Sequence, residues 1–376
     1  MKKTLAALAV LGAFAGSAMA ADVTLYGAVD TGFEYIHTKS TGEKGVDTFD
    51  MQTGWDTPSR WGLKGSEDLG NGYKVSFKLE SGFNSDDGTM GQSNRLFGRE
   101  AGLTLSGPFG SVAFGRFGGI SSSAGTYDML GYVESFDGGD GNVWGFASSS
   151  RYDNMVVYQT PRFAGLQLTA QYSFKTDTKE GDTVGADHKP QYNGDEGTSH
   201  AQRYASVGLS GEYGPASFAV GYELTKYGAN TNGARALDKD GQLVFVGGNY
   251  DFEVVQLFAE AQYFKHQTAI NAGDDATAEL GLGKLGLKGY GLHLGAAAPL
   301  AGGTLTAGLY YVDLSEEAVD QADEDAKYYG VSARYNYPLS ERTSLYAGAG
   351  YGQLKDDDSG NKDQLTQVYC GLVHTF

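Results

Sequence analysis

Apolar and polar residues alternate with a period of two in many short segments of this 376-residue chain. In residues 166–175 (LQLTAQYSFK), leucine, alanine and aromatic residues take the even positions, and glutamine, threonine, serine and lysine take the odd positions. Successive side chains of a strand point to opposite faces, so this pattern predicts strands with one apolar and one polar face. The same alternation recurs in residues 23–35, 73–80, 217–225 and 304–311.

The connections between these segments alternate between short and long. Short turn-like stretches, which hold five of the seven prolines, recur at residues 68–72, 106–110, 160–165, 212–216, 250–253, 299–303 and 337–343. Eight longer connections are polar, acidic and rich in glycine. Seven short and eight long connections separate sixteen strands and leave both termini on one side.

Two architectures fit alternating strands. In a water-soluble sandwich the apolar face points inward, whereas in an outer-membrane barrel it points to lipid and the polar face lines a lumen. Segments of about ten residues are long enough to cross a bilayer with tilt. Aromatic residues near segment ends, such as Tyr158, Tyr227, Tyr310 and Tyr311, fit interfacial girdles. These features favour a 16-stranded antiparallel transmembrane β-barrel, an all-β fold.

The chain ends in an alternating segment, VYCGLVHTF (368–376), which stays apolar up to Phe376. A sheet edge cannot stay unpaired in hydrocarbon, because each unsatisfied backbone group there costs several kcal/mol. The last strand is therefore expected to pair with the first. In this arrangement Val368, Cys370, Leu372, His374 and Phe376 share the lipid face.

The N-terminus predicts export. Two lysines, an apolar run and the residues GSAMA form a secretory signal peptide over residues 1–20, with Ala21 as the first mature residue. No composition shift divides the rest, so residues 21–376 are expected to form a single barrel domain.

Charge and composition exclude several classes. The chain has 28 basic and 46 acidic residues, a formal net charge of −18, which argues against nucleic acid as a partner. The single cysteine excludes an internal disulfide framework, and the six histidines lack the spacing of a zinc site. We expect neither a metal nor a cofactor, and no enzyme activity.

Four blocks resemble the general porins of Gram-negative outer membranes, the trimeric 16-stranded type. They are residues 21–35 (ADVTLYGAVDTGFEY), 59–84 (SRWGLKGSEDLGNGYKVSFKLESGFN), 97–117 (FGREAGLTLSGPFGSVAFGRF) and 371–376 (GLVHTF). The resemblance implies a homotrimer in the outer membrane, with short periplasmic turns, long extracellular loops and a water-filled pore in each subunit. It also implies contact with lipid and lipopolysaccharide. Insertion by the barrel-assembly machinery would depend on the C-terminal strand, with Leu372, His374 and Phe376 as its signal.

The family also folds its third outer loop into the barrel, where loop carboxylates face basic residues on the wall. Here that loop is residues 118–151, and its candidate constriction acids are Asp128, Glu134, Asp137 and Asp140. The candidate wall bases are Arg60, Lys64, Lys78, Arg99 and Arg116, with Lys74 and Arg95 as further candidates. Strict alternation places Arg99 on the lipid face with Leu103 and Leu105, so either a bulge redirects it or subunits bury it.

Opposed charges across a narrow waist would select small hydrophilic solutes and ions, which diffuse passively. The excess of acids predicts a mild cation preference, although the charge balance at the constriction decides the sign. Three alternatives stay open at this stage: a substrate-specific channel for sugars or carboxylates, a non-channel barrel such as an adhesin or an outer-membrane enzyme, and a secreted soluble sandwich.

Overall fold

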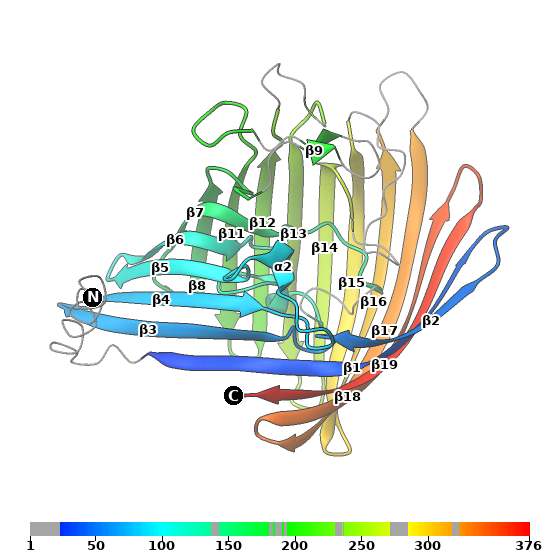
Figure 1. The fold of residues 1–376 in the computed structure, drawn as a ribbon, viewed down its shortest axis with the longest axis horizontal. Coiled ribbons are helices and arrows are strands. Elements are labelled where there is room, and N and C mark those ends of the chain that lie inside the picture. The colour runs from blue at the N-terminus through cyan, green and yellow to red at the C-terminus, as the bar shows by residue number, and fades with distance from the viewer. Residues whose placement is uncertain are drawn as a thin grey trace, which may run out of the picture.

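The computed structural model describes residues 23–136, 143–179, 183–184, 190–191, 194–229, 235, 237–270, 285–317 and 323–376. Within these residues, seventeen strands form one antiparallel sheet that closes into a barrel (Figure 1). Its first strands are β1 (Thr24–Ser40), β2 (Val46–Thr53), β3 (Arg60–Gly70), β4 (Tyr73–Gly82), β5 (Glu100–Gly107), β6 (Gly110–Gly118), β7 (Arg151–Gln159) and β8 (Leu166–Ser173). The others are β11 (Arg203–Tyr213), β12 (Ala216–Lys226), β13 (Gly241–Asp251), β14 (Gln256–Gln267), β15 (Leu287–Leu300), β16 (Gly303–Glu316), β17 (Glu324–Ser340), β18 (Thr343–Asp356) and β19 (Lys362–Thr375).

The remaining elements are short. Strands β9 (Thr183–Val184) and β10 (Pro190–Gln191) pair with each other between β8 and β11. The helical turn α2 (Gly91–Asn94) precedes β5, and the 3-10 turn η1 (Leu130–Tyr132) lies between β6 and β7. The described residues contain no helix that is long and apolar enough to cross a membrane.

The barrel has the sixteen strand positions that the sequence predicts, because β2 and β3 share one position. Both pair with β1: β2 along residues 31–38 and β3 along residues 24–28. Residues 54–59 separate them and interrupt what would otherwise be one long strand.

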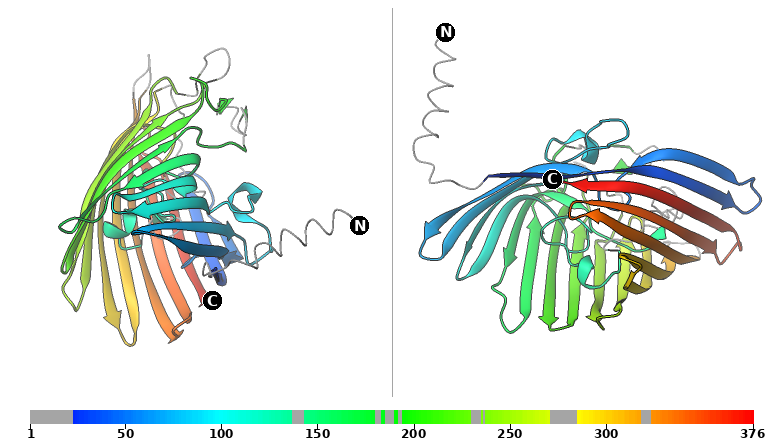
Figure 2. Two further views of the ribbon diagram at one scale, coloured as in Figure 1. Left: turned by 90° about the vertical axis from the view of Figure 1, so that its left-hand side faces the viewer. Right: turned by 90° about the horizontal axis from the view of Figure 1, so that it is seen from below.

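The barrel closes between its first and last strands, as the C-terminal pattern predicts. Strand β1 pairs antiparallel with β19 from Ala28 opposite Thr375 to Ser40 opposite Asp363, and the two strands lie side by side in Figure 2. Beyond them, the backbones of Gly27 and Phe376 exchange two hydrogen bonds of 3.0 Å. A Cβ at Gly27 would lie 2.3 Å from the ring of Phe376, so only glycine allows the terminal ring to lie here.

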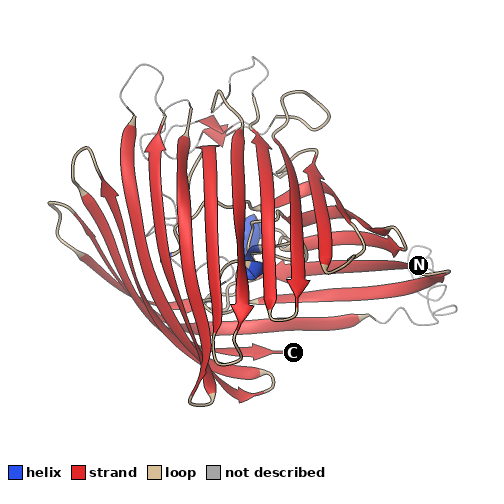
Figure 3. Cartoon of the chain, turned by 180° about the vertical axis from the view of Figure 1, so that it is seen from behind, coloured by secondary structure: helices blue, strands red, loops and turns tan. Residues whose placement is uncertain are grey.

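All seven predicted short connections join neighbouring strands at one end of the barrel, and longer connections lie at the other end (Figure 3). In the β3–β4 turn, Gly70, Asn71 and Gly72 all have positive φ angles (81°, 53° and 79°), a conformation that suits glycine and asparagine. The first long connection differs from the expectation. Most of it forms the paired ends of β1 and β2, and only residues 41–45 remain as a turn.

The apolar face of the strands points out of the barrel. Exposed apolar side chains on this face include Phe33, Leu103, Leu168, Leu309 and Leu372. Their neighbours along the strands point inward and are buried, as Asp30, Thr169 and Tyr369 show. The predicted parity is therefore confirmed, and the medium outside the barrel must be apolar.

A hydrophobic core fills part of the barrel interior, where the sequence predicts a polar wall. It joins Ile120, Leu130, Val133 and Phe146 of the β6–β7 connection to inward side chains of β13, β14 and β16, such as Phe245. Apolar side chains are thus needed on both sides of these strands. Two predicted girdle residues belong to the interior, since Tyr227 and Tyr310 are buried.

Candidate functional site

A group of charged side chains lines the inner wall formed by β3, β4 and β5, and Glu80 lies at its centre. Arg99 donates from Nε to Glu80 Oε1 at 2.6 Å, and Tyr26 donates to Oε2 at 2.9 Å. Lys78 Nζ lies 3.6 Å and Arg60 Nε 3.9 Å from the same Oε2. One buried carboxylate therefore neutralises part of the charge of three bases, and tyrosine and arginine donors satisfy its oxygens.

Two further bases lie at this wall. Lys78 also forms an ion pair with Glu100, whose carboxylate accepts hydrogen bonds from the backbone and side chain of Thr126. Lys64 Nζ lies 5.1 Å from the ring centre of Tyr26, so it shares the inner face with Arg60. The structure thus brings Arg60, Lys64 and Lys78 together on the lumen side.

Arg99 corrects the prediction from strict alternation. Strand β5 begins only at Glu100, so Arg99 precedes the region in which alternation applies. Its side chain is 8% exposed and points to Glu80 inside the barrel, rather than toward lipid with Leu103 and Leu105. Its backbone N–H also donates to the Glu80 carbonyl at 3.2 Å.

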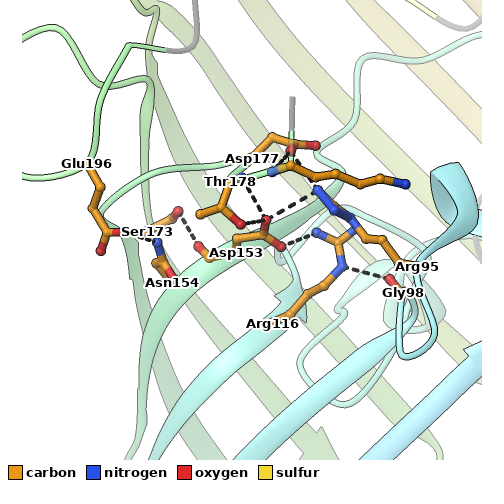
Figure 4. Close-up of polar contacts among 10 residues, drawn as sticks. Arg95, Gly98, Arg116, Asp153, Asn154, Ser173, Asp177, Thr178 and Glu196 are labelled. Atoms are coloured by element: carbon orange, nitrogen blue, oxygen red, sulfur yellow. Dashed lines mark hydrogen bonds and ion pairs between the residues drawn. The ribbon is translucent and has the colours of Figure 1, made fainter. Parts of the chain in front are cut away.

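A second charged cluster lies around Asp153 on β7 (Figure 4). Arg116 Nη1 donates to Asp153 Oδ1 at 2.5 Å, and its Nε donates to the Gly98 carbonyl at 2.7 Å. Arg95 Nη2 lies 3.3 Å from Asp153 Oδ2 and 2.6 Å from Asp177 Oδ1. The cluster connects the segment before β5 with β6, β7 and the segment after β8.

A backbone irregularity explains the orientation of Arg116. The pairing of β6 with β7 shifts register between Gly115 and Phe117, and Gly115 has a φ of 141°, which favours glycine. Such a bulge redirects side chains, so parity cannot predict where Arg116 points. Nearby, Arg151 at the start of β7 lies close enough to Arg99 and Arg116 for mutual repulsion.

The predicted constriction acids occupy several environments. Asp128 accepts backbone hydrogen bonds from Ser123 at 2.9 Å and Leu130 at 3.2 Å, so it stabilises the turn around it. Glu134 is 1% exposed and contacts Glu260 of β14. A side chain buried this deeply does not contact permeating solutes directly. Asp137 and Asp140 lie outside the described residues, so their place at the constriction stays a prediction.

The connection between β6 and β7 crosses the barrel interior and is anchored at both ends by one carboxylate. Glu223 of β12 accepts hydrogen bonds from the backbone and hydroxyl of Ser121, both at 3.0 Å, and from the Ser149 hydroxyl at 3.0 Å. Tyr204 donates to the same group at 2.8 Å. We refer to the described residues of this connection, 119–136 and 143–150, as the inward loop. Sequence patterns place Glu223 on a polar strand face but give no sign of this role.

Two further wall strands hold the middle of the inward loop. The Ser135 backbone N–H donates to His293 Nε2 of β15 at 3.2 Å. Tyr328 of β17 donates from its hydroxyl to the Val143 carbonyl at 2.6 Å. Polar anchors and the interior hydrophobic core together fix the inward loop against one side of the barrel and leave the charged wall on the other side.

Comparison with known proteins supports this geometry. A family model for Gram-negative porins matches residues 6–358. An outer membrane porin protein of Bordetella pertussis is 34% identical over 410 residues, covering 100% of both chains. Outer membrane porin protein 32 of Delftia acidovorans is 31% identical over 386 residues, covering 99% of this chain and 95% of the relative. Among solved structures, an anion-selective porin from Comamonas acidovorans matches with a TM-score of 0.66 and 24% identity, covering 94% of this chain and 99% of that one.

A closed barrel with an apolar exterior, a charged inner wall and one loop folded through its interior is an outer-membrane channel. This chain belongs to the Gram-negative porin family and is an integral barrel of the Gram-negative outer membrane.

Proposed function

We propose that this porin is a general diffusion pore, through which ions and small hydrophilic solutes pass down their gradients. The supporting observation is that charged groups on the inner wall keep partial access to water. The side chains of Arg60 and Lys78 are each 29% exposed although they face the barrel interior. Charged groups hydrated inside a membrane barrel are typical of an aqueous passage, and such a passage needs no catalytic step.

Permeation of a solute series tests the general pore. Liposomes containing the purified protein should swell at rates that fall smoothly with solute size, whatever the solute's chemical class. A sharp preference for one sugar or carboxylate would instead indicate a substrate-specific channel. The absence of conductance steps in planar bilayers would indicate a non-channel barrel and overturn the proposal.

We further propose that the pore weakly prefers anions, opposite to the sign that total charge predicts. The charge balance along β3–β7 and the segments before β5 and after β8 supports this, because the bases there outnumber the acids. The bases are Arg60, Lys64, Lys78, Arg95, Arg99, Arg116 and Arg151, and the acids are Glu80, Glu100, Asp153 and Asp177. Charges outside the barrel are screened over about 8–10 Å at physiological salt, so the nearest wall charges dominate.

Reversal potentials in a salt gradient test this preference. Arg60→Gln should move the reversal potential toward cation preference, because it removes a positive charge beside the ion path. Lys74→Gln is the matched control: Lys74 lies on β4 next to the short-turn end, opposite Ser106 and away from Glu80. Cation preference in the unmodified protein would contradict the proposal.

We also propose a homotrimer that associates with lipopolysaccharide and is inserted by the barrel-assembly machinery. Leu372 and Phe376 support recognition of the last strand, since both are exposed on the outer face. Phe376→Ala should slow assembly in cells more than refolding in detergent, whereas an equal effect on both would indicate lost stability alone. Slow migration of unboiled protein in a gel would support the trimer.

The predicted signal peptide, residues 1–20, lies outside the described residues, and N-terminal sequencing of the mature protein should begin at Ala21.

A further inference from the structure

The break between β2 and β3, residues 54–59, lies on the inner side of the barrel, because its contacts are with inward-facing residues of β1, β19 and β17. Asp30 of β1, which is fully buried on the inner face, holds it there. Its Oδ2 accepts the backbone N–H groups of Asp56 at 2.9 Å and Thr57 at 2.8 Å. The break has a local cause, because Gly54 has a φ of 77° and Pro58 cannot donate to the sheet.

This segment extends across the inner face of neighbouring strands. The Trp55 ring stacks on Tyr369 of β19, with ring centres 5.2 Å apart and planes 14° apart. Beyond it, Asn336 of β17 donates to Asp56 Oδ1 at 2.6 Å. Strand β17 is the third strand from β1 across the closure, and strands lie about 4.8 Å apart. Residues 54–58 therefore cover the inner face of β19 and β18.

One arginine connects this segment to the inward loop. Arg334 of β17 donates from Nη1 to the Trp55 carbonyl at 3.0 Å, and its Nε lies 3.3 Å from Asp56 Oδ1. Its guanidinium carbon also lies 5.0 Å from the ring centre of Phe136, which belongs to the inward loop. Two chain segments that enter the barrel from different strands therefore meet on one side chain.

We propose that residues 54–58 are a second constriction element of this pore and that Trp55 limits the size of solutes that pass. Arg334 is the positioning residue, because it sets the distance between this element and the inward loop. The proposal rests on the function as a diffusion pore and adds a size filter to it. The indole is a large, rigid group with few rotamers, so its removal should widen the passage on the β18–β19 side.

Conductance and solute size provide the first test. In planar bilayers, Trp55→Ala should raise single-channel conductance, and in liposomes it should shift the size limit toward larger neutral sugars. The matched control is Phe49→Ala on β2, which removes an exposed aromatic ring stacked on Phe33 outside the barrel. Unchanged conductance and size limit in a Trp55→Ala protein that still shows heat-modifiable migration would overturn the proposal.

Thiol modification provides a second test that does not depend on widening. In a Cys370→Ser background, Trp55→Cys should react with a charged aqueous thiol reagent, and the reaction should reduce the current stepwise. Glu43→Cys, in the exposed turn between β1 and β2, should react without changing the current. Modification at residue 55 with no change in current would place the segment outside the solute path.

The positioning role of Arg334 is tested by current noise in single-channel recordings, which a purely structural role would not change. Arg334→Lys keeps the charge but loses the fork of donors, so it should increase current noise and leave the sign of ion selectivity unchanged. Equal noise in the variant and the unmodified protein would remove the positioning role. Failure of the unmodified protein to conduct would count against the diffusion pore itself, which separates the two proposals.

Discussion

Glu80 balances the charge of the inner wall, because its carboxylate contacts Arg60, Lys78 and Arg99 together with the Tyr26 hydroxyl. The side chains of Glu80 and Arg99 are 4% and 8% exposed, so water screens their interaction little. A buried pair of this kind is costly to break from one side only, since the remaining charge keeps its desolvation penalty.

Glu80→Gln is therefore expected to destabilise the barrel by about 3 kcal/mol and to shift selectivity further toward anions. Urea unfolding of protein in lipid vesicles measures the first effect, and reversal potentials measure the second. Glu43→Gln, in the exposed turn between β1 and β2, removes the same charge far from the wall and should change neither. A Glu80→Gln protein with unaltered selectivity would show that ions do not sense this cluster.

Single residues also show the limit of reading parity from sequence. Within regular strands, alternation places Asp30 inward and Phe33 outward correctly, because the pleat has a strict period of two. It fails for Arg99, which precedes β5, and it cannot orient Arg116, which lies at a bulge. Both are wall bases, so alternation is least reliable where the charges that control ion passage gather.

At the scale of elements, the inward loop depends on Glu223 more than on its own local structure. Its regular element η1 spans only three residues, and hydrogen bonds to Glu223 and His293 connect the loop to the barrel wall. No local sequence signal could have located these anchors, since Glu223 and Ser121 are 102 positions apart along the chain. The prediction that this loop folds into the barrel came from the resemblance to the general porins.

Glu223→Ala should lower the free energy that holds the inward loop in place by about 2 kcal/mol, because four buried donors, three of them in the loop, lose their acceptor. The expected result is more frequent partial closures in single-channel recordings. Glu196→Ala serves as the control, because Glu196 accepts a hydrogen bond from Asn154 at an exposed position outside the inward loop. Recordings that match the unmodified protein would show that the apolar core alone holds the loop.

The turn between β18 and β19 provides a pH-dependent contact. Lys327 and Lys355 form ion pairs with Asp357, and these contacts hold the pKa of Asp357 below its usual range. The pKa of Asp357 is lower in the folded protein than in the unfolded chain. The ion pairs therefore stabilise the turn at pH values above the unfolded-state pKa. Their contribution is lost as the pH falls through the folded-state pKa.

Lys327→Met should raise the pKa of Asp357, because it removes the largest stabilising contact of the carboxylate. An NMR titration of the side-chain carboxyl group measures the change. Lys362→Met removes an equal charge at the exposed start of β19 and should have a smaller effect. A titration midpoint that does not move would show that solvent screening outweighs the ion pair.

At the scale of the molecule, two sequence patterns predicted most of the fold. Alternation and the spacing of short turns predicted the strand positions, the lipid-facing parity and the pairing of β1 with β19. The segment with Trp55 was not predictable, because its residues resemble an ordinary loop and its partners Tyr369 and Arg334 are distant in sequence. Contacts inside the barrel between residues far apart in the chain produce no periodic pattern in the sequence.

The outward face gives a test of the whole architecture. Leu309→Arg, at a residue that is 55% exposed on the outer face, should destabilise the barrel by about 2–4 kcal/mol, the cost of arginine near the bilayer midplane. Thr306→Arg lies on the same strand but faces the interior, so it should cost much less. Unfolding from lipid vesicles compares the two, and equal costs would contradict a lipid-facing exterior.

The pairing of Gly27 with Phe376 also constrains how the molecule is made. Two strands that lie far apart along the chain must meet before the hydrocarbon-exposed edges disappear, so ring closure carries a large loop entropy. A chain truncated before β19 would keep two unsatisfied edges and be exposed to aggregation and proteolysis. The sheet can therefore close only after both β1 and β19 have been made.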